Sequence, residues 1–238
     1  MMQALLLAAG RGERMRPLSD AIPKPLLEAG GRMLIEWQIL ALARAGVTQI
    51  VVNTAHLAPA FEEALGDGSR WGVSIRFSRE GDRAEDALET GGGILRALPL
   101  LGKGPFLVAS ADIVTDFDYA GLAARCLALE QGAIDAHLVL VPNPPYHSRG
   151  DMGIEGARAT RTPPLLTYGN IGLFAPRLFS GLRAGRMRLF PWLYDAVDRG
   201  RVTAERFSGR WHNIGTPDDL LALRSELERR PLAGGGTY

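Results

Sequence analysis

Glycine and positive charge are concentrated near the start of the chain, in the stretch LLLAAGRGERMRPLSDAIPKPL at residues 5–26. An apolar run that ends in a glycine-rich turn exposes successive backbone N–H groups, which form a nest for phosphate oxygens. Gly10 and Gly12 permit close approach of the backbone. Charge-assisted donors are offered by Arg11, Arg14 and Arg16. The turn is typical of a polyphosphate site, although a tight turn with solvated arginines explains this fragment equally well.

Lys24 follows the turn and is flanked by Pro23 and Pro25. The two prolines stiffen the backbone, so the ammonium is presented from a preset loop and can act as a counter-charge for a reacting phosphate. The loop is not a Walker motif, because the Gly-Lys-Ser/Thr ending is missing. A dinucleotide fingerprint is excluded as well, since Met15 stands where the third glycine would be.

Asp112 ends the apolar run PFLVASAD at residues 105–112. A carboxylate at the carboxyl end of a buried strand lies where open α/β sheets bind ligands, and magnesium needs few protein carboxylates because phosphates and water supply its other ligands. The alternative role is an N-cap for the helix that begins near residue 118. Asp116 and Asp118 lie closer to that helix, so we expect Asp112 to bind a metal ion.

The elements that must position these residues follow from the hydrophobic pattern. Short apolar runs alternate with segments of helical period, which predicts an α/β fold with a parallel sheet covered on both faces by helices. In the first part of the chain we expect strands at 3–8, 49–54, 73–78, 105–112 and 135–142, and helices at 34–46, 58–68, 91–101 and 118–132.

The second part of the chain is less regular. Residues 142–163 are rich in Pro, Gly, Arg and Asp, and we expect them to form an insertion over a substrate. A strand is predicted at 165–174, a helix at 189–200, a hairpin-like segment at 201–215 and a capped helix at 216–230. We expect one domain over residues 1–230 and a disordered tail at 231–238.

Composition limits the classes of function. The 238 residues include 27 basic and 26 acidic side chains, so no overall basic field draws in nucleic acid or an anionic membrane. Cys126 is the single cysteine and cannot form an internal disulfide. The N-terminal run ALLLAA is too short to span a membrane. We expect a cytoplasmic protein.

The stretch LAAGRGERMRPLSDAIPKPLLEAGGRMLIEWQI resembles the signature of the sugar-1-phosphate nucleotidyltransferases, which runs L-A-A-G-x-G-x-R-[LM]-x-P-L-[ST], then P-K-P, then a helix. The resemblance continues through LETGGGILRALPLL, SADIVTD and WHNIGTP. It is strongest to the short branch of the family that contains N-acetylmuramate α-1-phosphate uridylyltransferase, because the chain lacks the left-handed β-helix of longer relatives.

The resemblance implies a Rossmann-like (GT-A-like) fold, with a nucleotide-binding part at about 1–141 and a sugar-binding part at about 142–210. It implies magnesium-dependent transfer from UTP to a sugar 1-phosphate, N-acetylmuramic acid α-1-phosphate in cell-wall sugar recycling, by a monomer or small homo-oligomer. Alternatives are GTP or dTTP with mannose-, heptose- or glucose-1-phosphate, a non-catalytic sensor of nucleotide sugars and, more distantly, an NAD-binding dehydrogenase.

The family's roles are carried onto matching positions only. Arg14, Lys24 and Asp112 are the catalytic residues that the resemblance implies. The implied nucleotide-binding residues are Ala9, Gly10, Gly12, Glu13, Arg14, Lys24, Glu89, Gly92 and Ser110. Asp151 and Asn170 match sugar-binding positions, and the implied metal ligands are Asp112 and Asn213.

The chain departs from the family pattern at two motifs. Asn213 stands where relatives have a second metal-binding aspartate, so it offers one neutral oxygen in place of a charge. Ser110 and Ala111 precede Asp112 where a small polar residue and a glycine are usual. In addition, no lysine follows Lys103, so an arginine would have to assist Lys24 and the metal at the sugar phosphate.

Overall fold

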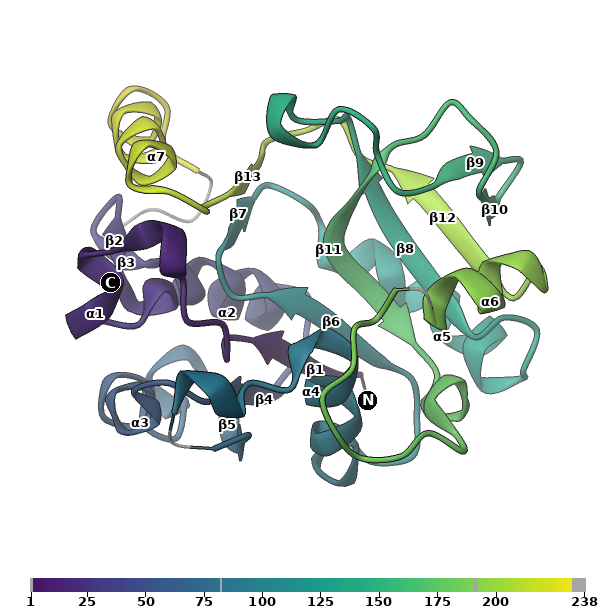
Figure 1. The fold of residues 1–238 in the computed structure, drawn as a ribbon, viewed down its shortest axis with the longest axis horizontal. Helices are drawn as coiled ribbons and strands as arrows, with labels where there is room; N and C mark the ends of the chain where they lie inside the picture. The colour runs from purple at the N-terminus through teal and green to yellow at the C-terminus, as the bar shows by residue number, and fades with distance from the viewer. Residues whose placement is uncertain (1, 82, 191, 233–238) are drawn as a thin grey trace.

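The structure is a computed structural model that describes residues 2–81, 83–190 and 192–232. A sheet with the strand order β5-β4-β1-β6-β11-β8-β12-β10-β9 runs through the molecule (Figure 1). Its strands are β1 (Gln3–Leu7), β4 (Gln49–Thr54), β5 (Ser74–Arg79), β6 (Phe106–Ser110), β8 (Ala136–Val141), β9 (Gly153–Glu155), β10 (Arg158–Thr160), β11 (Thr167–Phe174) and β12 (Val202–Arg206). Two small ribbons accompany it, formed by β2 (Glu28–Ala29) with β3 (Arg32–Met33) and by β7 (Ile113–Thr115) with β13 (Trp211–Asn213).

The first part of the chain builds four parallel strands around β1, which pairs with β4 on one side and β6 on the other. The chain moves outward from β1 to β4 and β5, and then returns to the opposite edge of β1 with β6. This reversal is a topological switch point, where open α/β sheets bind ligands at the carboxyl ends of their strands.

Helices cover both faces of the sheet, as the alternation of elements predicted. The helices are α1 (Leu18–Ala21), α2 (Leu34–Arg44), α3 (Ala58–Leu65), α4 (Glu89–Ala97), α5 (Ala123–Glu130), α6 (Trp192–Asp198) and α7 (Pro217–Arg229). Successive side chains of β1 point to opposite faces: Ala4 and Leu6 pack in the cluster that holds α2, α3 and α5, whereas Leu5 packs in the cluster that holds α4 and α6. The predicted α/β fold class is confirmed.

Strand β11 joins the two parts of the chain. It runs antiparallel to β6 on one side and to β8 on the other, and β12 then lies parallel to β8. The sheet is therefore continuous from the predicted nucleotide-binding part into the predicted sugar-binding part. The small antiparallel pair β9 and β10 lies at its far edge and comes from the irregular segment 142–163.

The hairpin expected at residues 201–215 is wrong. Val202 and Ala204 of β12 are buried, so this strand needs a place in the main sheet beside β8. β13 instead pairs with β7, and the Arg210 backbone and side chain are held by the Asp116 carboxylate between the two strands. The segment crosses from the main sheet to β7 and does not fold back on itself.

Helix α7 begins with the cap that the sequence predicted. The Thr216 side chain accepts from the Asp219 N–H, and the Asp219 carboxylate accepts from the Thr216 N–H, which completes a capping box. Leu232, in the predicted tail, is 6 % exposed and packs in the cluster that α7 forms with Trp37, whereas residues 233–238 lie outside the described chain. None of the described helices is long and apolar enough to span a membrane.

Candidate active site

A cavity of about 450 Å³ lies at the carboxyl ends of β5, β4, β1 and β6, which is the place that the switch point predicts. We call it the central cavity. Its lining residues are Leu7 to Glu13, Lys24, Pro25, Asn53, Glu80, Ala87, Glu89, Thr90, Ser110, Asp112 and Arg186. Most of the predicted nucleotide-binding residues are among them, namely Ala9, Gly10, Gly12, Glu13, Lys24, Glu89 and Ser110.

The glycine-rich turn has the open backbone that the sequence predicted. Gly12 adopts a left-handed conformation with φ of 67°, and a Cβ there would lie 3.1 Å from the Lys24 Cβ. At Gly10 no protein atom lies within 4 Å of an added Cβ, so that position faces open space. Met15, which stands where a dinucleotide site has its third glycine, is fully buried and fixes the turn to the core.

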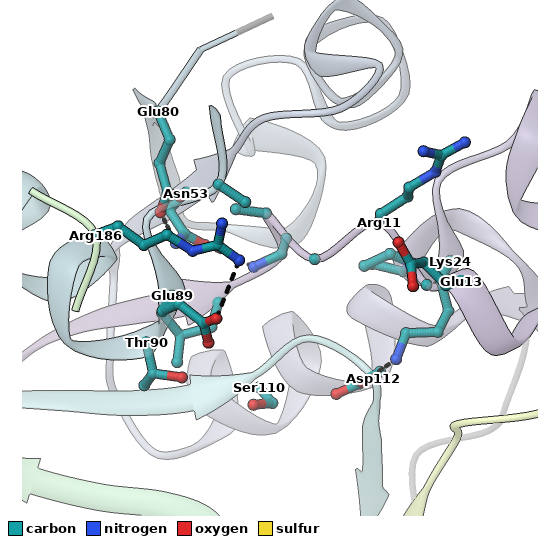
Figure 2. A pocket seen from close by; sticks show the side chains of 17 residues that line it. Arg11, Glu13, Lys24, Asn53, Glu80, Glu89, Thr90, Ser110, Asp112 and Arg186 are labelled. Carbon is teal, nitrogen blue, oxygen red and sulfur yellow. Dashed lines mark hydrogen bonds and ion pairs between the residues drawn. The ribbon is translucent and has the colours of Figure 1, made fainter. Parts of the chain in front are cut away.

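Lys24 and Asp112 form an ion pair at the wall of the central cavity (Figure 2). Both side chains are mostly buried, with exposed fractions of 14 % and 18 %. Pro23 and Pro25 flank Lys24 at the start of a short 3-10 helix, so the lysine backbone is fixed. Asp112 follows β6, and its backbone carbonyl accepts from the Ile214 N–H at 3.1 Å.

Arg14 does not line the central cavity, although the resemblance implied that it meets the phosphates. Its guanidinium lies beside Gly215, where an added Cβ would be 3.0 Å from the Arg14 Nη2 atom. Arg11, to which the resemblance assigned no role, lines the cavity instead, and its buried Nε has no hydrogen-bond partner in the described part of the chain. Arg16 pairs with Asp20 on the surface.

A buried polar network forms the opposite end of the central cavity, and the sequence reasoning missed it. The Asn53 Oδ1 atom accepts from the Ala8 N–H, and its Nδ2 donates to the Glu80 Oε1, both at 2.6 Å. The Glu80 Oε2 accepts from the Leu88 N–H at 2.6 Å. Burial raises the pKa of Glu80, against the lowering effect of these hydrogen bonds. The available signal was that Asn53 and Glu80 are polar residues at or just after the ends of β4 and β5.

The three glycines of LETGGGI let neighbouring backbone and side chains pack closely against the helix at this end of the cavity. An added Cβ at Gly92 would lie 2.3 Å from the Gly185 carbonyl, and one at Gly93 would lie 2.5 Å from the Glu80 carboxylate. Gly92 was expected to bind the nucleotide, but it lies against the 185–187 backbone and does not line the central cavity. Glu89 does line it, in a left-handed conformation with φ of 62°.

The two predicted sugar-binding residues lie together in a second cavity of about 220 Å³, which we call the lateral cavity. It is lined by Tyr146, His147, Asp151, Thr167, Tyr168, Asn170, Phe190, Trp211 and Asn213. Both carboxylate oxygens of Asp151 contact other residues of the protein. One accepts from the Tyr168 N–H at 2.8 Å, and the other lies 3.0 Å from the His147 Nε2. Asn170 is left-handed, with φ of 54°.

Asn213 connects the two cavities through the backbone. It pairs with Ile113 across the ribbon of β7 and β13, next to Asp112, while its side chain lines the lateral cavity. The Tyr146 hydroxyl is hydrogen-bonded to the Asn213 side chain; burial raises the pKa of Tyr146, and this hydrogen bond opposes the shift. Through this ribbon, Asn213 of the lateral cavity is paired with the residue that follows Asp112 of the central cavity.

The donor groups in and beside the central cavity fit a hard divalent cation. The Asp112 carboxylate accepts from the Lys24 ammonium, and Asn213, which has a neutral amide oxygen, pairs with Ile113, the residue after Asp112. In the described residues no group of three or more His, Cys, Asp or Glu side chains forms a metal site. A set of one carboxylate and one amide suits magnesium, which takes most of its ligands from phosphate and water.

Comparison with known proteins agrees with this geometry. The nucleotidyl transferase family model matches residues 3–160. The N-acetylmuramate alpha-1-phosphate uridylyltransferase of Neisseria meningitidis is 43% identical over 221 residues, which cover 90% of this chain and 94% of the relative. The enzyme of the same name from Caulobacter vibrioides is 33% identical, with 94% and 96% covered.

A solved structure has the same fold at low sequence identity. A Bacillus anthracis protein assigned as a glucose-1-phosphate thymidylyltransferase superposes with a TM-score of 0.83 at 20% identity, over 99% of this chain and 98% of its own. Because the family model and both sequence relatives span most of the chain, we conclude that this protein belongs to the nucleotidyl transferase family and is a nucleotidyltransferase.

Proposed function

We propose that the protein transfers a uridylyl group from UTP to N-acetylmuramic acid α-1-phosphate, which yields the UDP-sugar and pyrophosphate. One observation carries the proposal: Lys24 and Asp112, a paired cation and carboxylate, line the central cavity, and the residue after Asp112 pairs with Asn213 of the lateral cavity. The two relatives described above, which match nearly all of the chain, carry the name of this activity.

The chemistry needs little from the protein beyond alignment and charge. An oxygen of the sugar phosphate attacks the α-phosphorus of UTP in line, a new P–O bond forms, and the bond to the β-phosphate breaks so that pyrophosphate leaves. The attacking phosphate is already an anion, so no general base is needed, and no covalent enzyme intermediate forms. Positioning and neutralisation of charge then account for the rate.

Cationic side chains are available around the reaction centre. In the proposal Lys24 contacts the α-phosphate, because it is held beside Asp112 at the wall of the central cavity. Arg11 contacts the triphosphate from inside the central cavity, where its Nε has no partner among the described residues. Arg14 lies beside Gly215 and contributes charge from the neighbouring rim. The two arginines serve where a further lysine would otherwise bind phosphate, because no lysine follows Lys103 in the sequence.

Magnesium completes the proposed site. Asp112 would hold it as a charged ligand and Asn213 as a neutral one, and it would supply positive charge for the α-phosphate and the leaving pyrophosphate. Lys24 contacts the Oδ2 atom of Asp112 in this structure, and the carboxylate has a second oxygen that would serve an ion. The ammonium has three N–H donors, so it can contact Asp112 and a phosphate together.

The lateral cavity suits a sugar. Tyr168, Phe190 and Trp211 offer flat apolar faces, and Asn170 and Thr167 offer polar groups. The Trp211 indole N–H is committed to the Gly169 carbonyl at 2.9 Å, so its ring is held in place. Pockets that orient a polar ligand commonly combine aromatic faces with a few polar groups such as amides.

A substrate matrix tests the proposal. Pyrophosphate release is measured for UTP, GTP, dTTP and CTP against the 1-phosphates of N-acetylmuramate, N-acetylglucosamine, glucose, mannose and heptose, with and without Mg²⁺. The proposal predicts the highest kcat/KM for UTP with N-acetylmuramate 1-phosphate and loss of turnover in EDTA. A different preferred pair would overturn the substrate assignment, and absence of turnover with every pair would favour a nucleotide-sugar-binding protein without activity.

A further inference from the structure

Arg186 reaches the central cavity from the second part of the chain. It lies in the segment 181–190, which precedes α6, yet its side chain lines the cavity beside Glu89 and Thr90 of the first part. Figure 2 shows its guanidinium extending over the cavity toward Glu89, and the Nη2 and Oε1 atoms are 3.2 Å apart. Residue 186 is thus 97 positions from its partner in the sequence.

The backbone around Arg186 is fixed against the start of α4. The Met187 N–H donates to the Leu88 carbonyl at 2.9 Å, and the Met187 carbonyl accepts from the Gly92 N–H at 3.0 Å. Gly91 and Gly92 permit this approach, because an added Cβ at either position would lie within 3.0 Å of the backbone of 185–188. The side chain of residue 186 is thereby held at one end of the cavity.

The two ends of the central cavity differ in charge. Lys24, Arg11, Asp112 and Glu13 lie at one end, and Glu80, Asn53 and Glu89 lie with Arg186 at the other (Figure 2). A triphosphate belongs at the first end, because two cations balance the two carboxylates there, whereas at the second end two carboxylates face one cation. The second end is left for the base. The strand order agrees with this division of the cavity. β5 and β4 lead to the residues at the second end, whereas β6 leads to residues at the first end.

At the base end, Arg186 has N–H donors that no described residue uses. The Glu80 oxygens accept from Asn53 and the Leu88 N–H, and the Asn53 oxygen accepts from the Ala8 N–H, so this network is internally satisfied. Arg186 uses Nη2 for Glu89, and its side chain is 66 % exposed. A guanidinium carries five N–H donors, and an exposed ion pair contributes little energy, so the remaining donors are available to a ligand.

We propose that Arg186 reads the base by donating to a carbonyl oxygen, and that Glu89 is its positioning residue. The inference rests on the proposed function, because it requires that the central cavity holds a nucleoside triphosphate. Uracil presents a carbonyl oxygen at C4, whereas adenine presents an exocyclic amine at the corresponding C6 position, which is a donor. Arg186 therefore favours UTP over ATP, since a guanidinium cannot accept a hydrogen bond from an amine.

Calorimetric binding without sugar phosphate tests this role. UTP, ATP and inorganic tripolyphosphate are titrated with Mg²⁺ into the full-length wild type and into Arg186→Ala, Arg186→Lys and Glu89→Gln. Arg183→Ala is the matched control, because Arg183 is an exposed arginine of the same segment that does not line the cavity. Thermal melting of each variant confirms that it is folded.

The inference predicts that Arg186→Ala weakens UTP binding about tenfold to a hundredfold, the usual effect of a lost charged hydrogen bond. ATP and tripolyphosphate should bind as they do to wild type, so that the preference for UTP over ATP falls. Arg186→Lys and Glu89→Gln should give smaller losses, and Arg183→Ala none. An unchanged affinity for UTP would overturn the inference, and so would an equal loss for UTP and ATP, which indicates a structural effect of the substitution.

These measurements separate the inference from the proposed function. The substrate matrix decides whether the protein turns over UTP with a sugar phosphate, and it does not depend on Arg186. If wild type turns over UTP but Arg186→Ala keeps its selectivity, only the inference fails. If wild type binds UTP through Arg186 but releases no pyrophosphate with any sugar phosphate, only the proposed function fails.

Discussion

Lys24 is ion-paired with Asp112, a residue 88 positions downstream, at the point where the central cavity meets the ribbon of β7 and β13. The pair joins the proline-flanked loop, through Lys24, to the segment after β6, through Asp112. Each group is thereby held near the other without a ligand, and both stay mostly out of water. A charged pair preset in this way is suited to electrostatic stabilisation of a phosphoryl group.

Removal of either partner should abolish most turnover. We expect Lys24→Ala and Asp112→Ala each to lower kcat about a hundredfold or more, which is the usual effect of losing one positioned charge. Lys103→Ala is the matched control, because Lys103 is the other lysine of the chain and is exposed. Steady-state kinetics with circular dichroism to confirm folding provide the measurement, and near-normal rates in either variant would contradict the site.

The charge at residue 213 should set the magnesium requirement. Asn213→Asp adds a second carboxylate to the proposed ligand set, so the Mg²⁺ concentration for half-maximal rate should fall several-fold, and Asn213→Ala should raise it. A titration of activity with Mg²⁺ at saturating substrates compares the three proteins. If all three show the same requirement, Asn213 is not a ligand.

Asp151 should affect the sugar substrate and not the nucleotide. Its carboxylate holds His147 and the Tyr168 N–H in the lateral cavity, and an amide at this position cannot accept from both. Asp151→Asn should raise the KM for the sugar phosphate about tenfold and leave the KM for UTP within about twofold. Asp198→Asn, which alters an exposed pair with Arg161, serves as the control. A rise in both KM values would argue against a separate sugar site.

Gly92 should tolerate no side chain. An alanine Cβ there would lie 2.3 Å from the Gly185 carbonyl, so Gly92→Ala should displace the 185–188 backbone and lower the free energy of unfolding by about 1–3 kcal/mol. Gly104→Ala is the control, since no atom lies within 4 Å of a Cβ at that position. Urea unfolding measures the difference, and equal stability of the two variants would contradict the close packing.

His137 should make stability fall in acid. Its side chain is 1 % exposed, its Nδ1 is hydrogen-bonded to Thr203, and Glu205 lies 3.8 Å from its Nε2. Burial lowers the pKa of His137 from 6.5 to about 4, and Arg125 adds to the shift. Because the folded state prefers the neutral ring, the stabilisation is complete above about pH 6.5 and is lost as the pH falls from there toward 4.

Urea unfolding between pH 7.5 and pH 4.5 tests this dependence. In His137→Phe the ring cannot titrate, so the loss of unfolding free energy with falling pH should be smaller than in wild type, by up to about 1.4 kcal/mol per pH unit. The comparison uses the slope with pH, which is independent of any change in stability at pH 7.5 that the substitution causes. Parallel curves for the two proteins would contradict a buried neutral histidine.

The sequence determined the elements and indicated which residues form the candidate site. Alternating apolar runs and helical segments are local patterns, so the strands at β1, β4 and β6 and their flanking helices could be predicted with their approximate bounds. The glycine turn and the proline-flanked Lys24 are also encoded within a few residues. Asp112 could be singled out because it stands at the carboxyl end of a buried strand, which is where open α/β sheets bind ligands.

Only the tertiary structure decided which distant side chains meet. Arg186 and Glu89 lie 97 residues apart, and their contact depends on how the 185–188 backbone packs against the glycines of α4. Arg14 was expected at the phosphates, but the packing of the turn places it beside Gly215. The 201–215 segment reads locally as a hairpin, yet burial of Val202 in the main sheet separates its strands. Strand order and packing set these contacts, and short-range patterns do not encode them.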